Sequence, residues 1–213
     1  GATTFQDKVP FILKCNSSNS FTNIINQAIT ANVHDALRLN CIGVGFTIYP
    51  GSEFNFELIE EACRLFQEAK KAGLITVLWS YARGSMSKKG ETAINVISYA
   101  AHIAALCGAH VIKVKLPTSY LEENETKAAF LSNNIKIDTA TDRVKHIKKC
   151  CFNGKRIVVF SGGEAKNDEE LIKEIRAIKD GGGNGSIIGR NSFQRSRDKG
   201  LNLLKKIISI YKS

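Results

Sequence analysis

The stretch RIVVFSGG, residues Arg156–Gly163, decides the fold because it is an apolar run that ends in a pair of glycines. A second apolar run with the sequence SIIGRN follows at Ser186–Asn191, and a short helix is expected directly after it at Ser192–Arg195. In (β/α)8 barrels, the loops after strands 7 and 8 and the start of a short extra helix form a phosphate site. Two successive strand ends of this kind favour a barrel over an open parallel sheet. The alternative is that these are ordinary turn glycines.

The rest of the chain alternates between short apolar runs and helical patterns. Six runs bounded by Gly, Pro, Ser or Asn predict strands at Val9–Cys15, Ile42–Tyr49, Ile75–Tyr81, His110–Leu116, Arg156–Ser161 and Ser186–Gly189. Apolar stripes predict helices at Val33–Leu39, Phe56–Ala72, Thr92–Cys107, Thr141–Cys151, Asp168–Asp180 and Gln194–Tyr211. Strict alternation of this kind is typical of an α/β protein with a parallel sheet covered by helices. No Gly-x-Gly-x-x-Gly motif supports a dinucleotide site.

Length and composition predict one globular domain that covers residues 1–213. The chain is 43% hydrophobic, and its apolar runs are too short to span a membrane. Without a signal-peptide pattern, we expect a soluble, cytoplasmic protein that has no membrane partner. The six cysteines have no Cys-x-x-Cys spacing, so reduced core thiols are expected and a metal site is not.

The charge balance favours an anionic partner. There are 30 Lys and Arg against 20 Asp and Glu, which gives a net charge of +10. Such a balance suits either nucleic acid or a phosphorylated small molecule. The basic residues of the C-terminal third interleave with apolar residues at helical spacing, which solvated helix faces explain. No nucleic-acid-binding motif accompanies them, so we expect no nucleic-acid partner.

Two lysines interrupt the apolar run GAHVIKVKLP at Gly108–Pro117. Side chains alternate across a strand, so Lys113 and Lys115 project from the same face. If that face lines a cavity, burial and mutual repulsion lower the pKa of an amine, as a Schiff-base lysine requires. The alternative is an edge strand with two solvated lysines. Lys14 is a third candidate cation for the same cavity. The alternative is that its aliphatic chain extends along the protein surface and its ammonium lies in solvent.

Two aromatic residues lie at the end of the strand that precedes the lysines. Trp79 and Tyr81 share one face, at the end of the strand where barrel enzymes keep their active sites. A tyrosine in that position can transfer a proton. A core tyrosine with a satisfied hydroxyl is the alternative interpretation.

Together these stretches resemble the archaeal-type class I fructose-bisphosphate aldolases, a family also found in bacteria. The resemblance runs essentially from end to end, with six motifs in order at family-like spacing. The motifs are Ile12–Asn16 (ILKCN), Gly45–Ser52 (GFTIYPGS), Trp79–Tyr81 (WSY) with Arg83–Gly84, Gly108–Ala109 followed by Lys113–Lys115 (KVK), Ser161–Gly163 (SGG) and Gly189–Asn191 (GRN).

The resemblance implies a (β/α)8 barrel that cleaves fructose 1,6-bisphosphate into dihydroxyacetone phosphate and glyceraldehyde 3-phosphate without a metal or another cofactor. It places the Schiff base on Lys113 and the proton-transferring tyrosine at Tyr81, with Trp79 lining the pocket. Lys115 is expected to be the neighbouring charge that keeps Lys113 partly neutral. The implied phosphate cradle consists of Ser161, Gly162, Gly163, Gly189 and Arg190.

The chain departs from the family pattern in its strand count. The six predicted strands would be strands 3 to 8 of the barrel, so the first two βα units are not among them. The family's first strand carries an aspartate that supports catalysis, and no residue here replaces it. Six strands do not close an eight-stranded barrel, and their exposed edges would favour association. We therefore expect a homo-oligomer, as the family forms.

Two other functions remain open. Relatives on this scaffold use the same lysine for other aldolase, sugar-phosphate transferase or thiolase chemistry. From a different class, a chain with an incomplete barrel could be a non-catalytic phosphosugar-binding or assembly subunit. The residues also leave open the exact sugar phosphate, the oligomeric state, and whether the flux runs toward glycolysis or gluconeogenesis.

Overall fold

The structure is a computed structural model that describes residues 4–5, 8–18, 21–163 and 166–213. Its main feature is a sheet of six parallel strands in the spatial order β1-β4-β5-β6-β7-β8. The strands are β1 (Ile12–Lys14), β4 (Gly43–Ile48), β5 (Ile75–Ser80), β6 (Val111–Lys115), β7 (Ile157–Ser161) and β8 (Gly185–Ile187). Each lies within or beside a predicted strand, so the predicted parallel α/β arrangement is confirmed.

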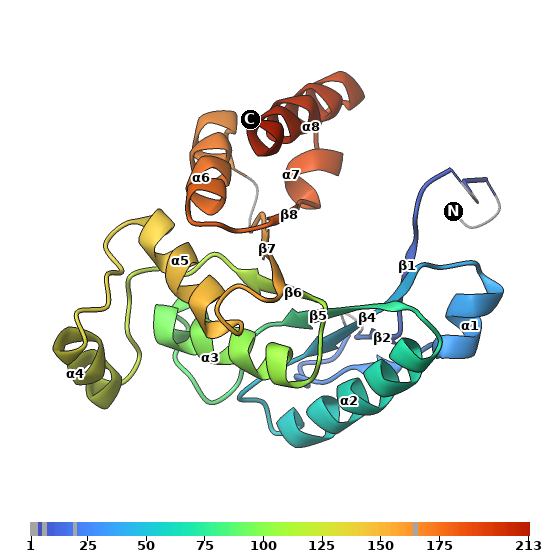
Figure 1. Ribbon diagram of the computed structural model, residues 1–213, viewed down its shortest axis with the longest axis horizontal. Helices are drawn as coiled ribbons and strands as arrows, with labels where there is room; N and C mark the ends of the chain where they lie inside the picture. Colours follow the sequence, from blue (N-terminus) through green and yellow to red (C-terminus); the bar gives the residue numbers. More distant parts are fainter. Residues whose placement is uncertain (1–3, 6–7, 19–20, 164–165) are drawn as a thin grey trace.

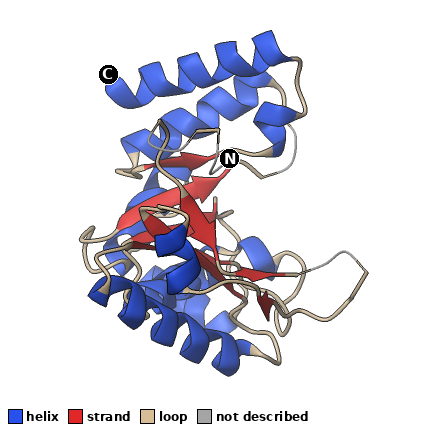
Figure 2. Ribbon diagram, turned by 90° about the vertical axis from the view of Figure 1, so that its right-hand side faces the viewer, coloured by secondary structure: helices blue, strands red, loops and turns tan. Residues whose placement is uncertain are grey.

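Helices connect the strands and cover one face of the sheet (Figures 1 and 2). Figure 1 shows α2 and α3 beneath the sheet, and α6, α7 and α8 grouped beside β7 and β8. The helices are α1 (Val33–Arg38), α2 (Asn55–Lys71), the 3-10 turn η1 (Gly90–Thr92), α3 (Ile94–Leu106), α4 (Asn124–Ser132), α5 (Ala140–Cys150), α6 (Asp168–Asp180), α7 (Arg190–Phe193) and α8 (Arg197–Lys212). Among the described residues, none of these helices combines the length and the apolar character needed to cross a bilayer.

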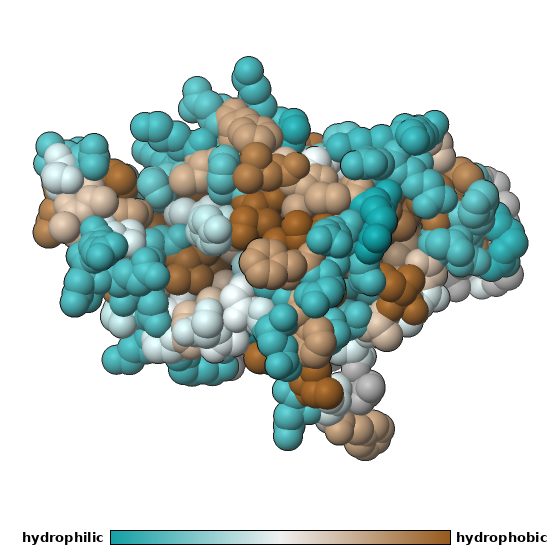
Figure 3. Space-filling model, turned by 90° about the horizontal axis from the view of Figure 1, so that it is seen from below, coloured by the Kyte–Doolittle hydropathy of each residue, from teal (hydrophilic) through white to brown (hydrophobic). Residues whose placement is uncertain are grey.

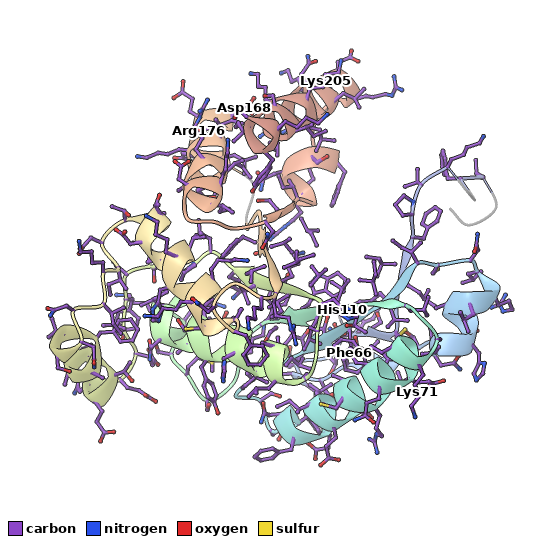
Figure 4. All side chains as sticks on the ribbon, viewed as in Figure 1. Phe66, Lys71, His110, Asp168, Arg176 and Lys205 are labelled. Atoms are coloured by element: carbon purple, nitrogen blue, oxygen red, sulfur yellow. The ribbon has the colours of Figure 1, made fainter. Side chains whose placement is uncertain are left out.

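The main hydrophobic core lies between the sheet and these helices. The helix α2 buries a stripe at helical spacing, formed by Leu58, Ala62, Phe66 and Ala69. In Figure 4, Phe66 lies between α2 and the sheet, whereas Lys71 at the end of the same helix is exposed. On the sheet side, the fully buried partners include Phe46, Leu78, Ile112 and Phe160. Burial of these large side chains is the main source of stability.

The opposite face of the sheet is open at its amino-terminal end. Ile12, Ile75 and Ile157 are 43%, 38% and 47% exposed. By the strand register, all three project from the same face as Lys113. In a closed barrel such side chains fill the interior, which requires strands on all sides. The six strands therefore form part of a barrel wall whose interior face is incompletely covered.

Sequence patterns missed two small features and misplaced two helix starts. A two-stranded antiparallel sheet joins β2 (Asn16–Ser17) to β3 (Ala28–Ile29), and strands of two residues show no alternation. The helix α4 buries only Phe130, so it has no apolar stripe to detect. The helix predicted at Gln194–Tyr211 begins later, after the extended residue Ser196, and the short helix predicted at Ser192–Arg195 begins earlier, at Arg190.

Gly45 of β4 gives a direct test of how this open face is built. A methyl group at this glycine would overlap the indole ring of Trp79. We expect Gly45→Ala to destabilise the fold by about 1–3 kcal/mol in urea unfolding, because a packed side chain must shift. The fluorescence of Trp79 should change as well, and it can be read directly because the chain has one tryptophan.

The control for this test is Gly73→Ala. Its added methyl meets no atom within 4 Å, but the backbone has a φ of +75°. It should therefore destabilise the fold through backbone strain and leave the fluorescence of Trp79 unchanged. Unaltered fluorescence in Gly45→Ala would contradict the described position of the indole.

Candidate active site

The predicted catalytic residues lie together near the carboxyl ends of the strands. In the register of the sheet, Trp79 of β5 is paired with Lys113 of β6, and Lys115 is paired with Ser161 of β7. Paired residues in a parallel sheet project from the same face, and Tyr81 follows Trp79 by two residues. The sheet therefore gathers these residues on its open face, at the end where barrel enzymes carry their active sites.

Lys113 lies among aromatic rings rather than acceptors. Its Nζ is 5.8 Å from the ring centroid of Trp79 and 6.0 Å from that of Tyr81. Within the described residues it makes no hydrogen bond or ion pair. Burial lowers the pKa of Lys113 from 10.5 to about 8, because a desolvated ammonium is less stable than the neutral amine. A useful fraction of this lysine is then a free nucleophile near neutral pH.

Lys115 is in a different electrostatic position. Its Nζ is 2.9 Å from Oε2 of Glu91, and the other carboxylate oxygen is 3.1 Å from Lys88. The two lysines hold the pKa of Glu91 below its usual value, against the effect of burial. The charge of Lys115 is thus balanced, and the lowered pKa of Lys113 has burial as its cause rather than the expected repulsion from Lys115.

Tyr81 is half-buried beside Lys113. Burial, together with the neighbouring Tyr49, raises the pKa of Tyr81 to about 12, although Arg83 opposes this. The phenol is therefore protonated at neutral pH and can donate a proton. A nearby positive charge that forms during a reaction would favour its ionised form.

The structure also brings together the two loops predicted to hold a phosphate. Arg190 donates a hydrogen bond of 3.2 Å from its guanidinium to the carbonyl of Gly163. The buried Asn191 donates one of 3.0 Å from its side-chain amide to the carbonyl of Gly162. Ser161 ends β7 beside them, and Gly189 precedes the first turn of α7. The predicted cradle residues are therefore neighbours, and residues 164–165 of the first loop lie outside the described part.

Some important contacts were not assigned from sequence. Glu91 lies in η1, well outside the strands, and nothing in its surroundings marks it as a partner of Lys115. The link that Asn191 makes between the two loops was also missed, although its place in the GRN motif was a signal. A large hollow of about 1550 Å³ has neither Lys113 nor Lys115 in its lining.

That hollow lies on the outer side of the helices and is lined by residues of α2, α3, α4 and α5. Tyr99 and Leu106 of α3 line it and are 67% and 63% exposed. Figure 3, which views the molecule from below, shows apolar residues gathered on its lower face. His102 and His146 also line this hollow.

The arrangement matches that of known barrel proteins. The structure superposes on that of an archaeal fructose-1,6-bisphosphate aldolase whose catalytic lysine is covalently bound to the carbinolamine intermediate of the substrate. The TM-score is 0.82 at 29% sequence identity, and the match covers 99% of this chain and 74% of that chain. The fold is therefore that of a (β/α) barrel, of which this chain forms a part.

Sequence comparisons assign the family. Residues 1–195 match the profile of a family described as "DeoC/LacD family aldolase". The chain is 33% identical over 226 residues to a Chlamydia trachomatis protein named probable fructose-bisphosphate aldolase class 1, covering 99% of this chain and 64% of that protein. It is 32% identical over 212 residues to a Methanocaldococcus jannaschii fructose-bisphosphate aldolase/6-deoxy-5-ketofructose 1-phosphate synthase. That match covers 95% of this chain and 62% of that protein.

The chain belongs to the DeoC/LacD family of aldolases. This confirms the resemblance to class I fructose-bisphosphate aldolases that the motifs indicated. The chain spans less than two thirds of the length of these two curated relatives, at 64% and 62%.

The burial of Lys113 has a measurable consequence for stability. We expect Lys113→Met to unfold at a higher urea concentration than the native chain near neutral pH, because the variant has no ammonium to desolvate. The gain should shrink as the pH rises from about 8 toward 10.5. In that window the unfolded chain binds a proton that the folded amine has already lost, so the native chain gains stability with pH.

Lys115→Met is the matched control, since it removes a lysine two residues away on the same strand. It breaks the ion pair with Glu91, so no gain in stability is expected near neutral pH. Equal effects of the two substitutions across this pH range would show that the burial of Lys113 is not what separates the two lysines.

Proposed function

We propose that this chain cleaves fructose 1,6-bisphosphate to dihydroxyacetone phosphate and glyceraldehyde 3-phosphate through a Schiff base on Lys113. The observation that carries the proposal is the state of Lys113, a half-buried amine with a pKa of about 8 beside Trp79 and Tyr81. The names of the relatives support the substrate class. The contact between the two loops at the ends of β7 and β8, which carry the predicted cradle residues, supports a phosphorylated substrate.

The chemistry begins with attack by the neutral Lys113 amine on the C2 carbonyl. Loss of water forms an iminium ion, which draws the electron pair of the C3–C4 bond toward its nitrogen when that bond breaks. Glyceraldehyde 3-phosphate leaves, and an enamine remains on the lysine. Protonation of C3 and hydrolysis of the imine then release dihydroxyacetone phosphate and restore the amine.

Tyr81 is the proposed proton carrier in this sequence. The iminium charge forms beside its ring and favours the phenolate, against the effect of burial. Once the phenol has lost its proton to solvent, the phenolate takes the proton of the C4 hydroxyl during cleavage and returns it to C3 of the enamine. Lys115 is proposed to contact the substrate, and the cradle anchors the phosphate on C1 so that the ketone meets the amine in register.

The nucleophile can be identified by trapping. We expect borohydride reduction in the presence of dihydroxyacetone phosphate to leave a stable adduct, which peptide mapping would place on Lys113. The adduct should disappear in Lys113→Met and persist to some degree in Lys115→Met. The reverse pattern would make Lys115 the nucleophile, and a folded chain with no adduct would support a non-catalytic phosphosugar-binding subunit.

Tyr81→Phe tests the proton carrier. It should lower kcat for cleavage by about 10²–10⁴, the usual contribution of a positioned acid or base. Trapping on Lys113 should persist, because imine formation does not require the phenol. A variant with unchanged kcat would contradict the assignment of Tyr81.

Related Schiff-base activities can be distinguished from the proposed one by their substrates. The name of the Methanocaldococcus relative includes a second activity, a 6-deoxy-5-ketofructose 1-phosphate synthase. A related Schiff-base aldolase, transferase or thiolase would form the same adduct on Lys113 and would not turn over fructose 1,6-bisphosphate. Trapping followed by a cleavage assay therefore separates the chemistry from the substrate.

A further inference from the structure

A second lysine lies against Trp79, on the same face of the sheet as Lys113 but at the opposite edge from the phosphate cradle. Lys14 is the last residue of β1, and its Nζ is 5.9 Å from the ring centroid of Trp79. The corresponding distance for Lys113 is 5.8 Å. The indole lies across Gly45 of β4, the residue paired with Lys14 in the register of the sheet. Both amines therefore lie within 6 Å of the centre of one aromatic ring.

The ammonium of Lys14 is held by a network of polar side chains. It donates to the backbone carbonyl of Asn16, to Oδ1 of Asn16 at 3.0 Å and to Oε1 of Gln27 at 2.9 Å. Asn16 is completely buried and exchanges two hydrogen bonds of 2.8 Å with the backbone of Thr47. Gln27 donates a bond of 2.8 Å to the hydroxyl of Tyr49. Lys14 is thus fixed in place rather than extended into solvent.

All three acceptors of Lys14 are neutral oxygens. Within the described residues, no carboxylate lies within 4.0 Å of its Nζ, whereas Lys115, Lys166 and Arg195 each have one. Burial lowers the pKa of Lys14 from 10.5 to about 8. The exposed Arg83 adds a second positive charge nearby, with its guanidinium 5.3 Å from the ring centroid of Tyr49. A partly buried cation without a counter-charge is a favourable place for an anion.

The order of the strands indicates which phosphate of the substrate would reach Lys14. The cradle lies on β7 and β8, Lys113 lies on the adjacent β6, and Lys14 lies on β1 at the far edge. The phosphate on C1 is one carbon from the ketone that Lys113 attacks, so it suits the cradle. The phosphate on C6 is four carbons away in the other direction, toward Trp79 and Lys14.

We propose that Lys14, held by Asn16 and Gln27, binds the phosphate of the aldehyde half of the substrate and so selects bisphosphates over sugars with a single phosphate on C1. This inference rests on the proposed function, because it takes the Schiff base on Lys113 as its reference point. Lys14 contributes to binding and to the positioning of C4, and it takes no part in covalent chemistry.

The test compares two ligands that differ only in that phosphate. In Lys14→Met, the affinity measured by calorimetry for fructose 1,6-bisphosphate should fall about tenfold or more, as for loss of a charge-assisted hydrogen bond. The affinity for fructose 1-phosphate should change by less than about twofold. Equal losses for both ligands, or no loss for the bisphosphate, would overturn the proposal.

The matched control is Lys148→Met. Lys148 is also a partly buried lysine that donates to neutral oxygens, namely the carbonyl of Arg156 and the side chain of Asn184. These partners lie near the amino-terminal end of β7, away from the candidate site at the carboxyl ends of the strands. It should leave the preference for the bisphosphate intact. Loss of the preference in this control would overturn the proposal, because it would show that removal of any such lysine has this effect.

Two further measurements keep the outcome decisive. Trapping of dihydroxyacetone phosphate on Lys113 should persist in Lys14→Met, because that ligand lacks the aldehyde half; absence of trapping in the native chain would instead count against the proposed function. If Lys14→Met does not fold, the native chain still gives an answer. Its preference for the bisphosphate should fall as the pH rises through about 8, and a preference constant over that range would overturn the proposal.

Discussion

The candidate site depends on the register of the parallel sheet. Trp79 is opposite Lys113, and Lys115 is opposite Ser161, because β5, β6 and β7 are paired at those residues. Side chains alternate between faces, so a slip of one residue in β6 would turn both lysines into the core beneath the sheet. The buried residues Ile112 and Val114 prevent such a slip, because they would then lose their contacts with the helices. The same packing that stabilises the sheet thus orients Lys113, the proposed nucleophile.

Three lysines on this face differ in the groups that surround their amines. The difference fits the three roles proposed for them, which are substrate contact for Lys115, phosphate binding for Lys14 and nucleophilic attack for Lys113. Lys115 is paired with the carboxylate of Glu91. Lys14 donates to neutral oxygens, which fix its position and leave its charge available to an anion. Lys113 is surrounded by aromatic rings, which desolvate it without accepting a proton. Burial lowers the pKa of both Lys14 and Lys113 to about 8. Of these three lysines, Lys113 is the one for which the described residues provide no hydrogen-bond acceptor, which leaves its amine free for the role of the proposed nucleophile.

The strands and the predicted site residues could be read from sequence because they rest on local patterns. Apolar runs mark the six strands, and the alternation of side chains places Lys113, Lys115, Trp79 and Tyr81 on their faces. The contacts of Glu91 and Gln27 could not be found in this way. Each lies in a connecting segment, and its partner is 24 or 13 residues away in sequence. The helix α4 was not predicted because it buries only Phe130 and so has no apolar stripe in its sequence.

The incomplete wall of the barrel affects the two ends of the sheet differently. At the amino-terminal end, Ile12, Ile75 and Ile157 are exposed, because in the described part of the chain no strand faces them across the interior. At the carboxyl end, the site is assembled by contacts between nearby strands and loops: Lys113 lies beside Trp79, Arg190 contacts the loop after β7, and Gln27 holds Lys14. None of these contacts needs a closed barrel. The geometry of the site can therefore persist in a partial wall, whereas the exposed isoleucines make that wall prone to association.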